Sequence, residues 1–156
     1  MFSELTKANL WLKVFAFTKI PLIFFCRPKV VALDDEKCII RIPLRRRTRN
    51  HMNSMYFGVL STGADCAGGL LAMKVAKESG KKVSLVFKDF HADFYKRSMG
   101  NVVFTCNMGR EIEDLVERSL KSSDRLNLPV IVTATVPSIS DEVVANFTLT
   151  LSVKTK

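Results

Sequence analysis

One stretch of this chain, residues 54–79, is apolar around the whole circumference of a helix. Its pattern has helical periodicity, and the only charge before Lys74 is that of Asp65. A helix with apolar side chains on all sides is buried over most of its surface. Other elements must therefore enclose it, and the segment predicts a central helix wrapped by a sheet.

The two ends of this helix carry capping signals. Asn53 or Ser54 can cap its start, and Gly80 suits the left-handed position just past its end. Three glycines also interrupt its interior: Gly63, Gly68 and Gly69. Each costs roughly 1 kcal/mol relative to alanine in a helix. We therefore expect another backbone to approach the helix closely at these positions.

The sequence on either side of the central helix is mostly strand-like. Two short strands are predicted before it, over 29–33 and 37–44. After it, a long strand is predicted over 83–96, followed by strands over 102–108, 130–136 and 143–153. A short helix is predicted over 111–121. In the last strand, Val143 and the following odd-numbered residues are apolar and predicted to face the core, whereas Ser152 and the other even-numbered polar residues face solvent.

No linker or internal repeat divides the chain. We predict one α+β domain over 1–156, with an N-terminal amphipathic helix over 1–27 and the core over 28–156. Lys13 and Lys19 interrupt the apolar run of the first segment, and Pro21 breaks it. A membrane-spanning helix needs about 20 predominantly apolar residues with few charges. The segment is therefore predicted to cover one edge of the core, with contact to a membrane surface as the alternative.

Charge and cysteine content narrow the classes of partner and site. The 24 Lys and Arg residues outnumber 15 Asp and Glu residues, which gives a formal charge of +9. This excess favours a polyanionic partner, whether nucleic acid, anionic lipid, a phosphorylated cofactor or an acidic protein. The four cysteines have no metal-ligand spacing, so we expect no metal site. We interpret them as reduced, core-packed thiols, which suggests a cytoplasmic location.

Asp65 is the most informative single residue. A carboxylate inside an apolar helix is costly to bury unless it is paired or functional. The structural alternative to a functional role is a hydrogen bond to Ser61, one turn earlier, or to a neighbouring backbone amide.

The run from Asn50 to Asp65 resembles the active-site segment of hotdog-fold acyl-CoA thioesterases. That segment has an Asn, a loop ending in His-Gly-Gly at the helix start, and then an Asp or Glu within the helix. Asn50 stands in the place of the Asn, Tyr56-Phe57-Gly58 in the place of His-Gly-Gly, and Asp65 in that of the carboxylate. Ser84 matches a strand position where some members carry an active-site Ser or Thr.

The resemblance implies a hotdog fold, an antiparallel sheet wrapped around a long helix. The helix near 111–121 is similar to that of an uncharacterised thioesterase-like branch, with an extra helix before the last two strands. The implied activity is hydrolysis of an acyl-CoA or acyl-carrier thioester. The family site is shared between two subunits, so a homodimer or a dimer of dimers is expected. No cofactor is implied beyond the coenzyme A of the substrate.

The same resemblance assigns roles to the matching residues. Asp65 would be the general base, with the nucleophile as the alternative role, and the amides of Phe57 and Gly58 would form the oxyanion hole. Asn50 and Ser84 would orient the water or the substrate. The chain departs from the family at Tyr56 and Phe57, which replace His-Gly and place a bulky side chain beside the thioester. A non-catalytic acyl- or lipid-binding protein with the same fold is therefore the alternative.

A run of arginines, Arg45, Arg46, Arg47 and Arg49, precedes this segment. It is either a solvated loop or a phosphate-binding surface for coenzyme A or an acidic carrier, since guanidinium pairs well with phosphate. A nucleic-acid-binding module is a third interpretation, but no aromatic interleaving supports it, and we expect no nucleic acid. His51 precedes Asp65 by fourteen residues, as in hotdog hydroxyacyl dehydratases, yet their Gly-His-Phe-Pro signature is absent. We therefore place His51 with the substrate-binding residues.

Overall fold

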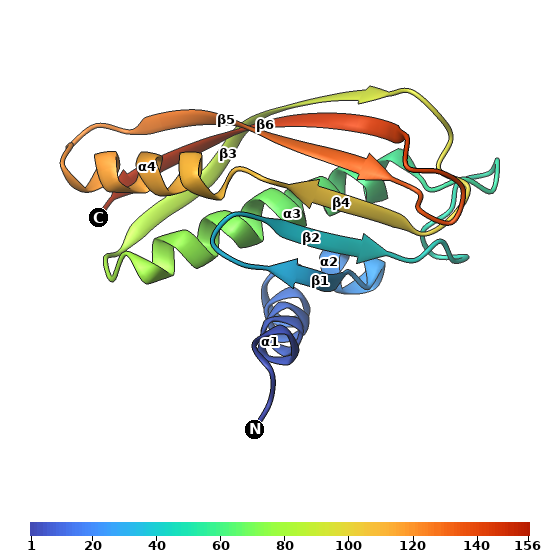
Figure 1. Cartoon of the computed structure of the whole chain (residues 1–156), viewed down its shortest axis with the longest axis horizontal. Coiled ribbons are helices and arrows are strands. Elements are labelled where there is room, and N and C mark those ends of the chain that lie inside the picture. The colour runs from blue at the N-terminus through green and yellow to red at the C-terminus, as the bar shows by residue number, and fades with distance from the viewer.

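The computed structural model describes all residues, 1–156. Six antiparallel strands form one sheet in the order β1-β2-β4-β5-β6-β3 (Figure 1). The strands are β1 (Lys29–Leu33), β2 (Cys38–Ile42), β3 (Val83–Phe94), β4 (Val102–Cys106), β5 (Leu126–Thr135) and β6 (Val143–Thr155). The helices are α1 (Glu4–Lys19), α2 (Pro21–Cys26), α3 (Phe57–Glu78) and α4 (Gly109–Leu120).

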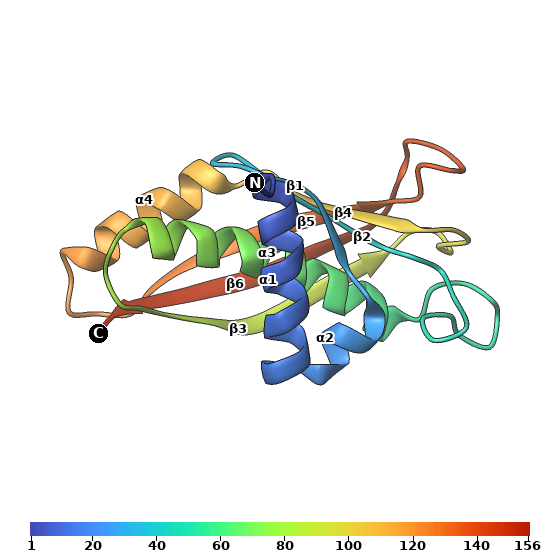
Figure 2. The same cartoon turned by 90° about the horizontal axis from the view of Figure 1, so that it is seen from below.

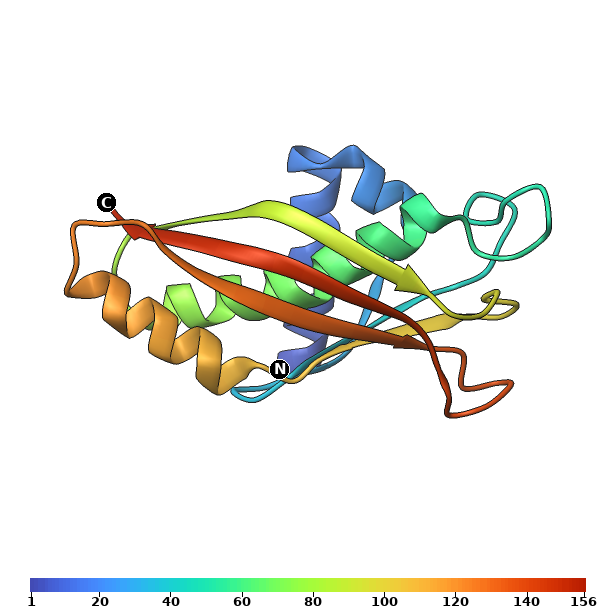
Figure 3. The ribbon, with the colours of Figure 1, turned by 90° about the horizontal axis from the view of Figure 1, so that it is seen from above.

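The sheet curves around α3, which is the predicted central helix. Seen from below, α1 crosses α3 on the side away from the sheet, and from above the strands cover it (Figures 2 and 3). More than half of the residues of α3 are buried, as its all-round apolar pattern predicts. The helix α4 precedes the last two strands and packs beside α3. The expected hotdog architecture, including the extra helix, is confirmed.

The start of α3 differs from the prediction, whereas its end agrees with it. The helix begins at Phe57, and its N-cap Tyr56 makes no side-chain capping hydrogen bond. Neither predicted cap serves the helix: the Ser54 hydroxyl bonds Asn50, and Asn53 adopts a left-handed turn with φ of 60°. Gly80 has φ of 70° just past the end of the helix, which confirms the role predicted for it.

The helix glycines make room for side chains, which corrects the expectation of a close backbone. A Cβ at Gly63 would overlap the ring of Phe104, which packs directly onto α3. At Gly68 and Gly69 the nearest atoms are side-chain atoms at 3.4 Å or more, an ordinary contact distance. Only Gly63 is thus required by packing, because a large ring from β4 occupies the space of its side chain.

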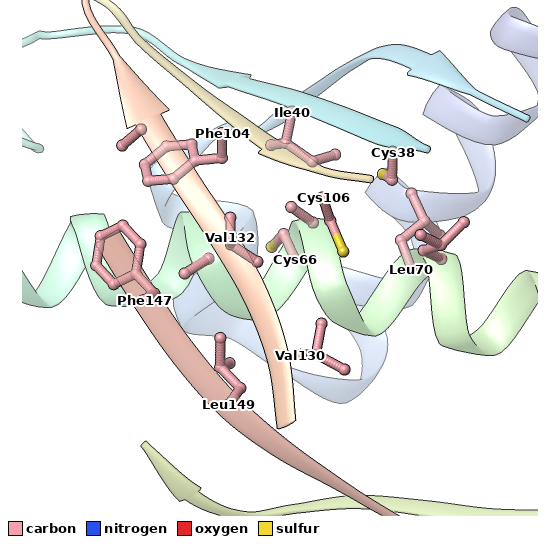
Figure 4. Close-up of a cluster of buried hydrophobic side chains, with 14 of the residues drawn as sticks. Cys38, Ile40, Cys66, Leu70, Phe104, Cys106, Val130, Val132, Phe147 and Leu149 are labelled. Carbon is pink, nitrogen blue, oxygen red and sulfur yellow. The ribbon is translucent and has the colours of Figure 1, made fainter. Parts of the chain in front are cut away.

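The four cysteines are free and buried, as predicted, and three of them lie between the sheet and α3 (Figure 4). Cys38 and Cys106 are direct cross-strand partners, and Cys66 faces them from α3. Burial raises the pKa of the Cys38 thiol to about 12 and that of Cys106 to about 11. These thiols stay protonated and pack as small apolar side chains.

The alternation predicted for β6 holds along most of the strand and fails near both ends. Val143 is 40% exposed, because it lies beyond a bulge that shifts the register between Ala134 and Thr135. Ser152 is buried although it was expected to face solvent. Its carbonyl accepts a hydrogen bond from the guanidinium of Arg125, whose side chain lies across this face of the sheet.

The N-terminal segment is not one amphipathic helix, which corrects the prediction for residues 1–27. Pro21 has no backbone N–H and keeps Ile20 out of the helical region, at φ −137° and ψ 79°, so α1 ends and α2 begins there. Only Leu12 and Ala16 of α1 are buried, and its opposite face is also apolar. None of the helices combines the length and the apolarity needed to cross a membrane.

Candidate active site

Asp65 lies in a groove of about 640 Å³ between α3, the two N-terminal helices and the first half of β3. We call it the α3 groove. Aromatic and aliphatic side chains line it, among them Trp11, Phe15, Ile23, Leu70, Leu85 and Phe87. The carboxylate of Asp65 is its only charged group. The groove therefore has the character of a pocket for an apolar chain with one reactive polar group.

The carboxylate of Asp65 has no partner in the protein. Its side chain makes no hydrogen bond and no ion pair, and the hydroxyl of Ser61 donates to the Phe57 carbonyl at 2.9 Å instead. The predicted structural alternative, a bond from Ser61 to Asp65, is therefore wrong. Burial raises the pKa of Asp65 above its usual value, because desolvation disfavours the charged form. A half-buried, unpaired carboxylate with a raised pKa has the properties of a general base.

The start of α3 presents two unpaired amides. The Tyr56 carbonyl accepts bonds from the amides of Val59 and Leu60, and no side chain caps the amides of Phe57 and Gly58. Free N–H groups at a helix N-terminus attract negative charge. The ring of Tyr56 lies over Gly58 beside them, so that a Cβ at Gly58 would stand 2.5 Å from this exposed ring and displace it.

Four exposed aromatic residues lie at the start of α3 and along the second half of β3, and we call them the aromatic cluster: Tyr56, Phe57, Phe90 and Phe94. The rings of Tyr56 and Phe57 are 4.9 Å apart, and Phe57 meets Phe94 edge-on at 6.4 Å. Phe57 is nevertheless 59% exposed. Its ring thus lies against that of Phe94 at the end of β3 and stays open to solvent.

The amides and the carboxylate of one chain are far apart. Phe57 and Asp65 are eight residues apart on one helix, or about 12 Å along its axis. The strand β3 links the two places. Its first half borders the α3 groove through Val83, Leu85, Val86 and Phe87, and its second half carries Phe90 and Phe94 of the aromatic cluster. One chain alone therefore cannot bring both groups to the same carbonyl.

The other predicted residues lie elsewhere in the chain. The side chain of Asn50 bonds Ser54 at 3.0 Å and accepts from the Met52 amide at 2.9 Å, so it holds its own loop together. His51 is exposed on that loop and makes no side-chain hydrogen bond. Ser84 does not line the α3 groove, and its hydroxyl lies 3.5 Å from the guanidinium of Arg125. Within one chain, neither Asn50 nor Ser84 joins Asp65.

Three of the four predicted arginines line a second cavity, of about 760 Å³, and two unpredicted ones join them. This arginine pocket is lined by Arg27, Arg41, Arg45, Arg46 and Arg47 together with Phe25 and Pro43. None of the five guanidiniums forms an ion pair, and that of Arg47 lies 5.2 Å from the ring centroid of Phe25. Unpaired guanidiniums in one pocket suit a phosphorylated ligand.

Arg27 and Arg41 were not predicted from the sequence, and Arg49 does not line the pocket. Arg27 follows α2 and Arg41 lies on β2, so only the fold brings them to the loop that carries Arg45. The single available signal was the alternation of β2, which turns Arg41 away from the core. Arg49 pairs with Met55 through the backbone, at the base of the loop.

Comparison with known proteins gives a fold and a family. No curated protein matches the chain. A protein of unknown function from Chlorobaculum tepidum superposes with a TM-score of 0.83 at 13% identity, covering 97% of each chain. A "putative thioesterase" from Shewanella oneidensis gives 0.80 at 14% identity over 96% of this chain and 99% of that one. A thioesterase from Haemophilus influenzae gives 0.67 at 13% identity over 99% and 93%.

At these identities the structural likeness establishes the hotdog fold alone. The sequence match is more specific. The family model described as "Domain of unknown function (DUF4442)" matches residues 9–153, and the chain belongs to that family.

Proposed function

We propose that the protein hydrolyses acyl thioesters, with Asp65 as the general base and with the acyl chain in the α3 groove. The observation that carries this proposal is the unpaired carboxylate of Asp65, the only charge in a groove lined by apolar side chains. The proposal is in line with the names of the structural neighbours from Shewanella oneidensis and Haemophilus influenzae.

The proposed reaction needs one water and one thioester. Asp65 takes a proton from the water as its oxygen bonds to the thioester carbonyl carbon, which gives a tetrahedral oxyanion. The amides of Phe57 and Gly58 hold that oxyanion at the positive end of the helix dipole. The intermediate then expels the thiolate as the C–S bond breaks, and the protonated Asp65 returns its proton to sulfur. The products are a carboxylic acid and a thiol.

Two copies of the chain would complete this site. Antiparallel pairing of β3 with β3 of a second copy would set residues 83–87 of one chain against 90–94 of the other. The α3 groove of each copy would then face the aromatic cluster, and the free amides, of its partner. This arrangement supports a homodimer because it removes the distance of about 12 Å between base and amides within one chain.

The arginine pocket supports coenzyme A as the carrier of the acyl group. Its five guanidiniums have no carboxylate partner, and bidentate pairing with phosphate suits them. Arg45, Arg46 and Arg47 keep the role expected from the sequence, and Arg27 and Arg41 extend it. Asn50 would act indirectly, by shaping the loop before α3. Ser84 and His51 have no role in the proposed reaction.

A non-catalytic acyl binder is the second candidate, and Phe57 favours it. It puts a bulky side chain at the start of α3, where the thioesterase segment that the sequence resembles has glycine, and the apolar groove would hold an acyl chain without any reaction. The two candidates differ only in turnover.

Thiol release from a panel of acyl-CoAs, from short to long and aryl chains, tests the proposal. Asp65→Asn keeps the shape of the side chain and removes the base, so the rate should fall by about 10²- to 10⁴-fold. Asp141→Asn, an exposed carboxylate in the loop before β6 that forms no ion pair, is the matched control and should leave the rate unchanged. The wild-type rate should also fall as the pH drops through the raised pKa of Asp65, because only the ionised form accepts a proton.

The panel also separates the candidates. Acyl-CoA binding without thiol release by any chain establishes the binder and overturns the hydrolase. Equal rates for the wild type and Asp65→Asn would remove Asp65 from the chemistry.

A further inference from the structure

The outward face of α1 is apolar where a surface helix is normally polar. Leu10, Val14 and Phe17 follow one another at helical spacing on the side opposite the buried Leu12 and Ala16. Their side chains are 59%, 54% and 64% exposed. We call these three residues the α1 outer face. Single exposed apolar residues are ordinary, but a row of them along one helix needs a partner.

This face lies on the outermost layer of the molecule, and α2 extends it. The helix α1 crosses α3 on the side away from the sheet, so no other element lies beyond it (Figure 2). On α2, Leu22 is 64% exposed and Phe25 is 52% exposed. Apolar side chains thus continue from α1 along α2 to the edge of the arginine pocket, which Phe25 also lines.

The surroundings of this apolar surface are basic. Residues 1–29 contain five Lys or Arg residues and one acidic residue, Glu4, which pairs with Lys7. Lys13 and Lys19 are exposed on α1 and form no ion pair. At the far end of α2 stand the five unpaired guanidiniums of the arginine pocket. An apolar helix face with a basic rim is the pattern of a helix that lies in the surface of an anionic membrane.

We propose that α1 and α2 dock the protein onto an anionic lipid bilayer, with the α1 outer face and Leu22 buried among the headgroups and upper acyl chains. The charges favour a bilayer over a second copy, because anionic headgroups would neutralise Lys13 and the five unpaired guanidiniums, whereas a second copy would bring the same positive charges. No helix is long and apolar enough to cross the bilayer, so the helices lie in its surface.

The position of α1 would also couple the bilayer to the α3 groove. Trp11, Leu12 and Phe15 line the groove from one side of α1, and the α1 outer face lies on the other. Docking would place the groove one helix away from the lipid, where long-chain acyl groups concentrate. This last consequence rests on the proposed function, whereas the docking itself does not.

Vesicle binding by the full-length protein tests the docking. Cosedimentation with vesicles measures the binding directly, because the only tryptophan of the chain, Trp11, lines the α3 groove and does not belong to the α1 outer face. Vesicles of equal parts phosphatidylcholine and phosphatidylglycerol should bind the protein. Pure phosphatidylcholine vesicles should bind it on the order of tenfold more weakly, and added salt should weaken the anionic case.

Two triple variants provide the decisive comparison. Leu10→Ser, Val14→Ser and Phe17→Ser together should lower vesicle binding on the order of tenfold or more. The matched control replaces Val31, Ile131 and Ile139, which are 44%, 47% and 63% exposed on other surfaces, by serine and should bind as the wild type does. Circular dichroism verifies that both variants are folded.

Several results would overturn the docking surface. These are no binding to anionic vesicles, equal binding by both triple variants, and equal affinity for neutral vesicles. Loss of an oligomer instead of vesicle binding in the α1 variant would assign the face to a second copy. No substrate is present in these measurements, so a failure of thioester hydrolysis leaves their outcome unchanged.

Discussion

The two edges of the sheet differ in whether the rest of the chain covers them. At the β1 edge, the side chain of Asn9 on α1 donates to the Val30 carbonyl at 3.0 Å and accepts from the Val30 amide at 2.8 Å. This side-chain amide pairs with the backbone as a neighbouring strand would. At the other edge, β3 is twelve residues long and pairs with β6 alone. Val86, Phe90 and Phe94 along it are between 43% and 50% exposed.

This difference indicates which edge of the sheet is open to pairing with another chain. An exposed strand edge is a template for pairing, and proteins normally cover or shorten it. The five-residue β1 is short and covered by α1, so its edge is closed within the chain. The longer β3 has no such cover and carries apolar side chains beside the α3 groove. We therefore expect a second copy at β3, as the proposed composite site requires.

The largest expected effect follows from placing charge on the open edge. Val86→Lys with Phe90→Lys would set like charges against each other across a β3–β3 contact. We expect the dimer dissociation constant to rise on the order of 100-fold, or about 3 kcal/mol. Light scattering across a concentration series measures this, and thiol release should fall with the dimer.

The closed edge provides the control for this variant. Val31 on β1 is 44% exposed, close to the exposure of Phe90. Val31→Lys should leave the oligomeric state unchanged. If it dissociates the protein as much as the β3 variant does, or if the wild type is monomeric, the assignment of the two edges is wrong.

A smaller effect is expected from opening the closed edge. Asn9→Ala removes both hydrogen bonds to Val30, each contributing about 1 kcal/mol, so unfolding should become easier by roughly 2 kcal/mol. For a chain of this length Tm should fall by about 4–8 °C, measured calorimetrically. Asn127→Ala, an exposed Asn on β5 whose side chain makes no hydrogen bond, should change Tm little. A similar fall in both variants would contradict a special role of Asn9.

The hydrophobic pattern of the sequence correctly predicted those elements whose place in the fold depends on burial alone. The all-round apolar character of 54–79 predicted the enclosed helix, and the position of Gly80 predicted its end. The start was misplaced because Asn50 and Ser54 bond each other within the loop, a local competition that the capping preference of either residue does not show. At Gly63 the expected close backbone is instead the ring of Phe104, which only the fold brings to the helix.

The candidate site was predictable only where its residues are close in sequence. Asp65 stood out because a lone carboxylate in an apolar helix is costly. Arg27 and Arg41 did not, since the fold alone brings them to Arg45. The apolar outer face of α1 was anticipated only through the alternative of contact with a membrane surface. The amphipathic interpretation assumed that the polar side faces outward, and nothing in the spacing of the apolar residues reveals which face is buried.

The smallest effect concerns stability at the open edge, where Asp65 borders β3. Burial raises the pKa of Asp65 above its unfolded value, so its proton is held more tightly in the folded state. The stability associated with this proton is present below about pH 4, the unfolded value, and is lost as the pH rises through the higher folded pKa. Asp65→Asn, which cannot ionise, should therefore melt a few degrees above the wild type at pH 7 and equal it at low pH.

The gain in Tm from Asp65→Asn can be compared between the wild-type protein and the Val86→Lys, Phe90→Lys variant. This comparison tests whether a β3–β3 contact covers Asp65. A second copy at β3 would cover the α3 groove and remove more water from Asp65, which would raise its pKa further. The gain from Asp65→Asn at pH 7 should then be larger in the dimer than in the Val86→Lys, Phe90→Lys background. Melting must be compared at one protein concentration, because the stability of a dimer depends on it. An equal gain in both backgrounds would mean that the groove stays open to water when the copies associate, and the partner's amides could then not lie against it.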